Sequence, residues 1–297
     1  MERRELLAGL AAMGGLTVAA PAATAADSKP ATGLVVEAVQ MPAWTGRDGQ
    51  RRPLSPGDTV STAQEVETAA AAGLLLKLPE GSLVRLGEKT RLGVQRLEVN
   101  AADGRTAVQS ELKLFDGFFR FATSAVAKVA GQRQIDVTLR TATIGIRGTD
   151  FWSMTDAEHD AACLFEGKVD LATRDQGALV LDKPTAFWAR FFSQPVKPVG
   201  NATPDELAKF LKSTELEPGK GVAVVGGRWR VVAAAPGSDA AAKALATTLR
   251  SQGYPAVVRA KGKVHEVRIN GFATRDDAAA ILQKIASVDR VRGRVAL

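Results

Sequence analysis

The sequence has few of the residues from which disulfides, metal centres and stacking surfaces are built. Its one cysteine, Cys163, cannot form a disulfide within the chain, which excludes a disulfide-framed mini-domain but not an exported protein. One cysteine and two histidines, His159 and His265, supply no clustered set of metal ligands. Aromatic residues make up 5% of the chain, and after the N-terminus no stretch reaches the roughly 20 apolar residues of a membrane-spanning helix. We therefore expect no metal, no cofactor and no transmembrane segment in the mature protein.

Sequence signatures of catalysis are missing as well. The chain has no nucleophile elbow, phosphate-binding loop or zinc-protease motif. His159 and Asp160 closely precede Cys163, a spacing that would bring a base near a nucleophile. Cys163 lies in the apolar segment 161–165, however, where a free cysteine is usually a buried hydrophobic residue. We expect that the protein is not an enzyme.

Positive charge is concentrated near the C-terminus. The net charge of the whole chain is +7. Residues 228–297 hold 13 lysines and arginines against five aspartates and glutamates, a net charge of +8, which leaves −1 for residues 1–227. The C-terminal segment is therefore expected to meet a polyanion or an acidic polymer.

The N-terminal residues have the pattern of an export signal. Two arginines, Arg3 and Arg4, precede a mildly apolar run, which ends in small residues with an A-x-A pattern. We expect residues 1–26 to be a signal peptide that is cleaved after Ala25 or Ala26, which would place the mature protein in the periplasm. The arginine pair resembles a twin-arginine signal, and a Sec signal or an uncleaved anchor is the alternative. No cysteine comes directly after the cleavage site, so a lipoprotein anchor is not expected.

The central part of the chain has the pattern of short β-strands. Apolar and polar residues alternate with a period of two, and turn signals recur about every ten residues. This predicts an all-β domain over residues 60–182, either a β-sandwich or a β-solenoid. Residues 27–59 are expected to form an N-terminal extension, and residues 183–227 a linker with one short helix capped by Thr203.

The C-terminal segment, residues 228–297, alternates strands and helices. The predicted order is β-α-β-β-α-β, with helices over residues 238–252 and 274–287, which is the α+β ferredoxin-like arrangement. Alternation directs one set of strand residues toward the helices: Trp229, Val231, Val267 and Ile269. The other set shares the open face of the sheet: Arg230, Val232, Glu266, Arg268 and Asn270.

Four ordered motifs give the β-rich segment a resemblance to the FecR domain family. They are Leu78–Gly87, Gly117–Phe121, Thr141–Phe151 and Glu166–Val169. Their glycines, Gly81, Gly148 and Gly167, fit turns that need a positive φ. We expect the third motif to be structural, with Arg147 paired to a carboxylate or carbonyl at a strand end and Asp150 accepting backbone N–H groups. The motif residues so assigned are Gly145, Arg147, Gly148, Thr149, Asp150 and Phe151.

The FecR resemblance implies binding of another protein. In iron-uptake regulators this domain follows an inner-membrane helix and a segment that contacts a sigma factor, and neither pattern is found here. We expect an interaction or scaffold module that binds an envelope protein not identified by the sequence. The alternative is a periplasmic signal-transduction protein that binds a receptor domain.

The C-terminal segment resembles the SPOR (sporulation-related repeat) family, which implies binding to the glycan strands of peptidoglycan. The resemblance rests on Trp229–Val231 and His265–Ala278. The family often has glutamine, glycine, tyrosine and arginine where this chain has Val232, Ala234, His265 and Glu266, which leaves a SPOR fold serving protein contacts as an alternative. The predicted open face has no aromatic residue for stacking bases, so we expect no nucleic-acid partner.

Overall fold

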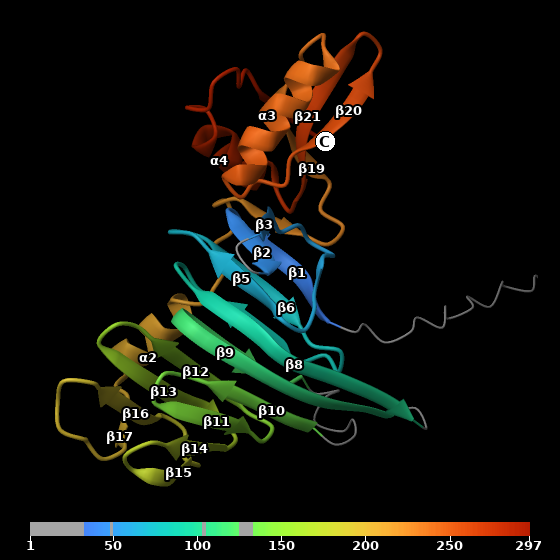
Figure 1. Cartoon of the computed structure of the whole chain (residues 1–297). Helices are drawn as coiled ribbons and strands as arrows, with labels where there is room; N and C mark the ends of the chain where they lie inside the picture. Colours follow the sequence, from blue (N-terminus) through green and yellow to red (C-terminus); the bar gives the residue numbers. More distant parts are fainter. Residues whose placement is uncertain (1–32, 48–49, 103–104, 125–132) are drawn as a thin grey trace, which may run out of the picture.

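The computed structural model describes residues 33–47, 50–102, 105–124 and 133–297. The expected signal peptide, residues 1–26, lies outside these residues. An extended β region leads into a smaller region of strands and helices at the C-terminal end (Figure 1). Within the described ranges no helix has the length and apolar character needed to cross a membrane.

The strands of the β region form two hydrogen-bonded sheets. The first sheet contains β1 (Leu34–Gln40), β4 (Thr59–Val60), β6 (Gly73–Lys77), β7 (Leu83–Leu86), β12 (Asp150–Thr155), β13 (His159–Glu166), β16 (Ala186–Phe191) and β17 (Gly200–Asn201). The second contains β2 (Ala43–Arg47), β3 (Gln50–Pro53), β5 (Gln64–Thr68), β8 (Arg91–Ala102), β10 (Arg133–Thr138), β11 (Ala142–Ile146), β14 (Val169–Thr173) and β15 (Gly177–Leu181). The long strand β9 (Arg105–Ala122) belongs to both: its first part pairs with β8 and β10, and its last part with β7 and β12.

Alternating apolar residues build one hydrophobic core from the two sheets. In β11, for example, Ala142, Ile144 and Ile146 are buried, while the residues between them are partly exposed. Leu74 and Phe151 of the first sheet belong to the same buried cluster as these side chains. The period-two alternation of apolar residues therefore identifies the side chains on the inward face of each strand.

Glycines with positive φ stand where the chain passes between the sheets. Gly117 (φ +97) separates the two parts of β9, Gly148 (φ +69) follows β11, and Gly167 (φ +86) follows β13. Gly81 also has a positive φ, of +95. The prediction of positive φ at Gly81, Gly148 and Gly167 is confirmed.

Two segments interpreted as extension and linker instead contribute to the sheets. Residues 34–60 supply β1 to β4, and β1 pairs with β6 over Val35–Gln40. In the expected linker, β16 pairs with β13 and buries Trp188 completely. The prolines and glycines of these segments mark turns between paired strands, which corrects both interpretations. The predicted helix is α2 (Pro204–Lys212), with Thr203 and Glu206 forming a capping box.

The C-terminal region has the predicted order of elements. They are β19 (Trp229–Ala234), α3 (Asp239–Ser251), β20 (Val257–Lys261), β21 (Val264–Phe272), α4 (Arg275–Lys284) and β22 (Arg294–Ala296). The strands pair antiparallel in the order β22-β19-β21-β20. Ser238 and Thr274 cap the two helices by accepting backbone N–H groups of Ala241 and Asp277.

Strand β18 (Val222–Val224) connects the two regions. It pairs with β1 on one side and, through Ala223 and Phe272, with β21 on the other. The fully buried carboxylate of Asp277 accepts the backbone N–H groups of Gly219, Gly221 and Val222 at 2.8, 3.1 and 2.9 Å. The chain leading into the C-terminal region is thus held by α4.

Candidate functional site

The sheet of the C-terminal region has one face packed against helices and one face without them. Val231, Val267 and Ile269 are fully buried, and Trp229 is partly buried against the same core. Leu249 of α3 and Ile281 of α4 belong to that core. The predicted inward set is therefore confirmed, and the opposite face holds the candidate site.

Glu266 is the centre of an ion cluster on the open face. Its carboxylate accepts a 2.7 Å hydrogen bond from Arg268 Nε and a 3.2 Å hydrogen bond from Arg294 Nη2. Lys261 Nζ lies 3.5 Å from the same carboxylate. The Glu266 side chain is only 4% exposed because these long side chains cover it.

Three cations around one carboxylate fix its protonation state. Hydrogen bonding from Arg268 is the largest influence and holds the pKa of Glu266 below its ordinary value, with help from Arg294 and Lys261. Glu266 is therefore ionised at neutral pH. After its charge is matched, two positive charges of the cluster remain uncompensated on the face.

The other predicted residues differ in their exposure. Asn270 is exposed, and Arg230 is partly exposed and lies directly across from it in the sheet. Val232 is only 2% exposed, because it lies between Arg268 on β21 and Arg294 on β22. The expectation that Val232 contributes to an open surface is corrected, since the flanking arginines cover it.

Sequence analysis missed the cations on the outer strands of this sheet. Arg294 is the cross-strand partner of Val232, Arg259 is the partner of Glu266, and Lys261 contacts Glu266. The same alternation, counted along β20 and β22, would have placed these three cations on the open face, but it was applied only to β19 and β21. The open face is consequently more cationic than the five predicted residues indicated.

The FecR-like motif residues make contacts within the β region. Arg147 donates to the carboxylate of Asp170 at the start of β14, as predicted. Asp150 was expected to accept backbone N–H groups, and it instead accepts two hydrogen bonds from the guanidinium of Arg120, at 2.9 and 2.7 Å. Phe151 is fully buried against Phe119.

Of the remaining residues of this motif, Thr149 lies at the turn and Gly145 lies within β11. Thr149 is buried, and its backbone N–H donates to Thr123 Oγ1 at 3.0 Å. Gly145 faces Asp136, where an added Cβ would lie 3.4 Å from the carboxylate. The motif thus fixes the passage from one sheet to the other.

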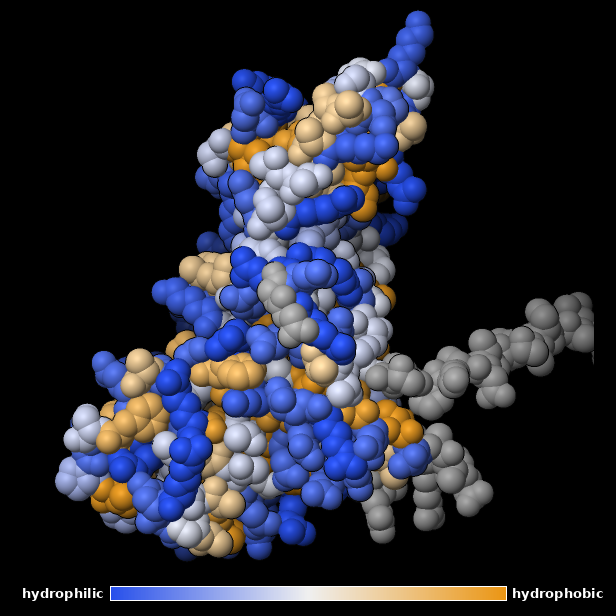
Figure 2. All heavy atoms as spheres, viewed as in Figure 1, coloured by the Kyte–Doolittle hydropathy of each residue, from blue (hydrophilic) through white to orange (hydrophobic). Residues whose placement is uncertain are grey.

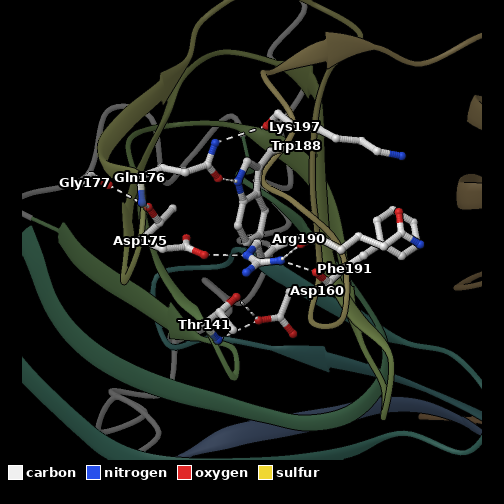
Figure 3. Close-up of polar contacts among 11 residues, drawn as sticks. Thr141, Asp160, Asp175, Gln176, Gly177, Trp188, Arg190, Phe191 and Lys197 are labelled. Carbon is white, nitrogen blue, oxygen red and sulfur yellow. Dashed lines mark hydrogen bonds and ion pairs between the residues drawn. The ribbon is translucent and has the colours of Figure 1, made fainter.

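The three residues considered for nucleophilic chemistry, His159, Asp160 and Cys163, have other surroundings in the structure. Asp160 is fully buried and accepts hydrogen bonds from the N–H and hydroxyl of Thr141 (Figure 3). It also accepts a hydrogen bond from the hydroxyl of Thr155. His159 stacks on the ring of Phe191. Burial raises the pKa of Cys163 to about 12, so its thiol is protonated at neutral pH.

A polar network beside these residues orders the chain after β14. The guanidinium of Arg190 contacts Asp175 and donates to the carbonyl of Gln194 at 2.9 Å. Gln176 accepts from Trp188 Nε1 at 2.8 Å and donates to the carbonyl of Lys197 at 3.1 Å (Figure 3). Over the ranges that the structure describes, no group of three or more potential ligands is placed to hold a metal ion.

Family comparisons match both regions of the chain. Residues 64–170 match the FecR protein family, and residues 225–293 match the SPOR domain. No curated protein matches the chain.

Two crystal structures of a candidate anti-sigma factor from Parabacteroides distasonis ATCC 8503 are similar to the chain. The first is 17% identical with a TM-score of 0.39, covering 50% of this chain and 64% of that one. The second is 12% identical with a TM-score of 0.40, covering 71% of this chain and 98% of that one. The chain thus spans less than two thirds of the first structure.

Proposed function

We propose that this chain, which carries a FecR domain followed by a SPOR domain, is a non-catalytic periplasmic protein that binds the glycan strands of peptidoglycan. The C-terminal sheet, with ferredoxin-like topology, is the binding surface. The observation that carries the proposal is the cationic open face around Glu266, in a region whose sequence matches the SPOR domain. SPOR domains bind peptidoglycan.

The chemistry of this face suits a sugar polymer. Guanidinium groups of Arg230 and Arg294 offer paired donors to carboxylates and hydroxyls, and the amide of Asn270 both donates and accepts. Lactyl carboxylates on glycan stripped of its peptides favour the remaining positive charge. The ion cluster holds Arg268 in place, whereas Arg230 stands outside the cluster and Arg294, at its edge, is still 58% exposed and can contact the ligand.

The β region, residues 34–224, is proposed as a sandwich that serves as a scaffold or interaction module. Its two-sheet arrangement favours the sandwich over the solenoid. The mature chain begins after the signal peptide in this proposal, and it is exported by the Sec or twin-arginine route.

A second function, protein binding by the β region, is favoured by the FecR match and by an apolar pocket beside α2. The pocket has a volume of about 320 Å³ and is lined by Arg120, Phe165, Pro184, Thr185, Leu207 and Leu211. In this alternative the protein relays an envelope signal by binding a receptor domain. Crosslinking of a receptor domain to α2 would favour it over the scaffold role.

Co-sedimentation of the full chain with amidase-treated sacculi tests the glycan proposal. The double variant Arg230→Gln/Arg294→Gln is expected to bind about tenfold more weakly, because two charge-assisted contacts are lost. Arg268 and Lys261 still compensate Glu266 in this variant. Lys183→Gln/Lys209→Gln, with the same change of charge at exposed positions of the β region, is the matched control. Equal retention of both variants would overturn the assignment of the sheet face.

A further inference from the structure

Three adjoining cavities cross the outer face of the second sheet. The largest, about 490 Å³, shares Thr138, Arg140 and Arg174 with a neighbour of about 170 Å³. It also shares Arg91 with a third cavity, of about 400 Å³, over β2, β3 and β5. We call these cavities together the outer groove. In the view of Figure 2 the surface around β8 and β9 is mostly hydrophilic.

The largest cavity carries excess positive charge. Arg91, Lys113, Arg140 and Arg174 surround one carboxylate, that of Asp116. Asp116 accepts a 2.8 Å hydrogen bond from Arg140 and lies 3.8 Å from Arg91, so it is shared by two of the cations. Arg91 also lies 3.7 Å from Glu65, which lines the third cavity, so the excess charge rests on Lys113 and Arg174. In the part of the chain that the structure describes, no carboxylate pairs with Lys113 or Arg174. This concentration of charge favours an anionic ligand, although residues 1–227 as a whole have a net charge of −1.

The floor of the groove follows one row of cross-strand neighbours from β9 to β14: Lys113, Thr138, Thr143 and Ala172. Beyond Lys113 the side chains of this row are small. At about 4.8 Å per strand the row is about 14 Å long. The hydroxyls of Thr138 and Thr143, 3.4 Å apart, lie side by side on it. An extended polymer can therefore lie across the strands and meet hydroxyls as well as cations.

The backbone of this surface is not available to a ligand. Strand β9 pairs with β8 and β10, and β11 pairs with β10 and β14, so a peptide cannot bind here by adding a strand. Recognition must use side chains. Guanidinium groups pair with carboxylates through two parallel hydrogen bonds, and threonine hydroxyls exchange hydrogen bonds with sugar hydroxyls.

We propose that the outer groove binds a polysaccharide with repeated carboxylates. The site lies on the β region and is separate from the C-terminal sheet to which glycan binding is assigned above. The shared chemistry has two sources, stripped wall glycan with its lactyl groups and other acidic polysaccharides.

Fluorescence anisotropy of labelled polygalacturonate oligomers with the full chain tests the proposal. The variant Lys113→Glu/Arg174→Glu is expected to bind at least about tenfold more weakly, because two contacts become repulsive and no acid loses a partner. Rising salt should weaken binding by the unmodified chain. Lys209→Glu/Lys263→Glu is the control with the same change of charge, and thermal unfolding monitors the fold of each variant.

Further arms separate the outcomes. The wall-glycan arm is measured in the Arg230→Gln/Arg294→Gln background, which weakens the C-terminal sheet. There, loss of binding to both polygalacturonate and amidase-treated wall glycan on adding the groove substitutions identifies the wall as a source of the ligand, and loss for polygalacturonate alone identifies another acidic polysaccharide. Arg230→Gln/Arg294→Gln should keep polygalacturonate binding. Failure of the groove proposal is therefore distinguishable from failure of the proposed glycan binding by the C-terminal sheet. Absence of binding by the unmodified chain, equal loss in the control, or equally tight binding of polyglutamate would overturn the proposal.

Discussion

Gly167 lies directly against the backbone of Gly148, so that a Cβ added at Gly167 would be 2.5 Å from the Gly148 carbonyl oxygen. The contact joins two passages between the sheets, one after β11 and one after β13. Both glycines have positive φ. Two motifs that resemble the FecR family are therefore one structural unit in space.

Gly167→Ala is expected to lower the free energy of unfolding by about 2–4 kcal/mol, because it combines an unfavourable positive φ with a clash against backbone. Chemical denaturation measures the change. Gly177→Ala is the matched control, since Gly177 has φ +70 but an added Cβ there meets nothing within 4 Å. That control should cost about 1 kcal/mol. Similar losses in the two variants would show that the contact with Gly148 does not matter.

Asp277→Ala should destabilise the protein by about 3 kcal/mol, because three backbone N–H groups lose a buried acceptor. Hydrogen exchange is expected to quicken at Gly221 and Val222. The variant Asp277→Asn keeps an acceptor oxygen, so its free energy of unfolding should lie between those of the unmodified chain and Asp277→Ala. Unchanged exchange at these amides would contradict the proposed hold of α4 on the connection.

The stability contributed by Glu266 should depend on pH. Its pKa is lower in the folded protein than the ordinary value of 4.5, so the contribution is fully present above that value and fades as pH falls through the folded pKa. The difference in unfolding free energy between the unmodified chain and Glu266→Gln should therefore shrink below pH 4.5. A difference that stays constant on acidification would show that the ion cluster does not stabilise the fold.

Cys163 should be unreactive in the native protein. Burial raises the pKa of its thiol to about 12, so almost no thiolate exists at about pH 8, where an unperturbed cysteine reacts readily. A disulfide reagent should label one thiol per chain in denaturant and essentially none before unfolding. Rapid labelling of the folded chain would contradict the described burial.

Local patterns predicted much of this fold. Alternation in the strands identified the buried residues Val231, Val267 and Ile269. The predicted cap Thr203 and the helix starts predicted at residues 238 and 274 agree within one residue with the starts of α2, α3 and α4. Long-range pairing was not predictable in the same way. Nothing local to Trp188 indicates that β16 completes a sheet with β13, and proline-rich flanks favoured a linker.

The same distinction explains the site. Arg268 and Asn270 could be placed on one face by counting along β21, whereas the burial of Val232 depends on its neighbours across two strands. Arg120, the partner of Asp150, is 30 residues away in the sequence, so the residues of the turn alone could not predict this pair.

The most direct test of glycan binding by the C-terminal sheet is a titration of the isotopically labelled full chain with soluble, peptide-free glycan strands, followed through its amide NMR signals. The account predicts that the largest shift changes lie on β19, β21 and β22, at Arg230, Asn270 and Arg294. Binding that leaves these amides unchanged, or that moves only signals of the β region, would contradict it.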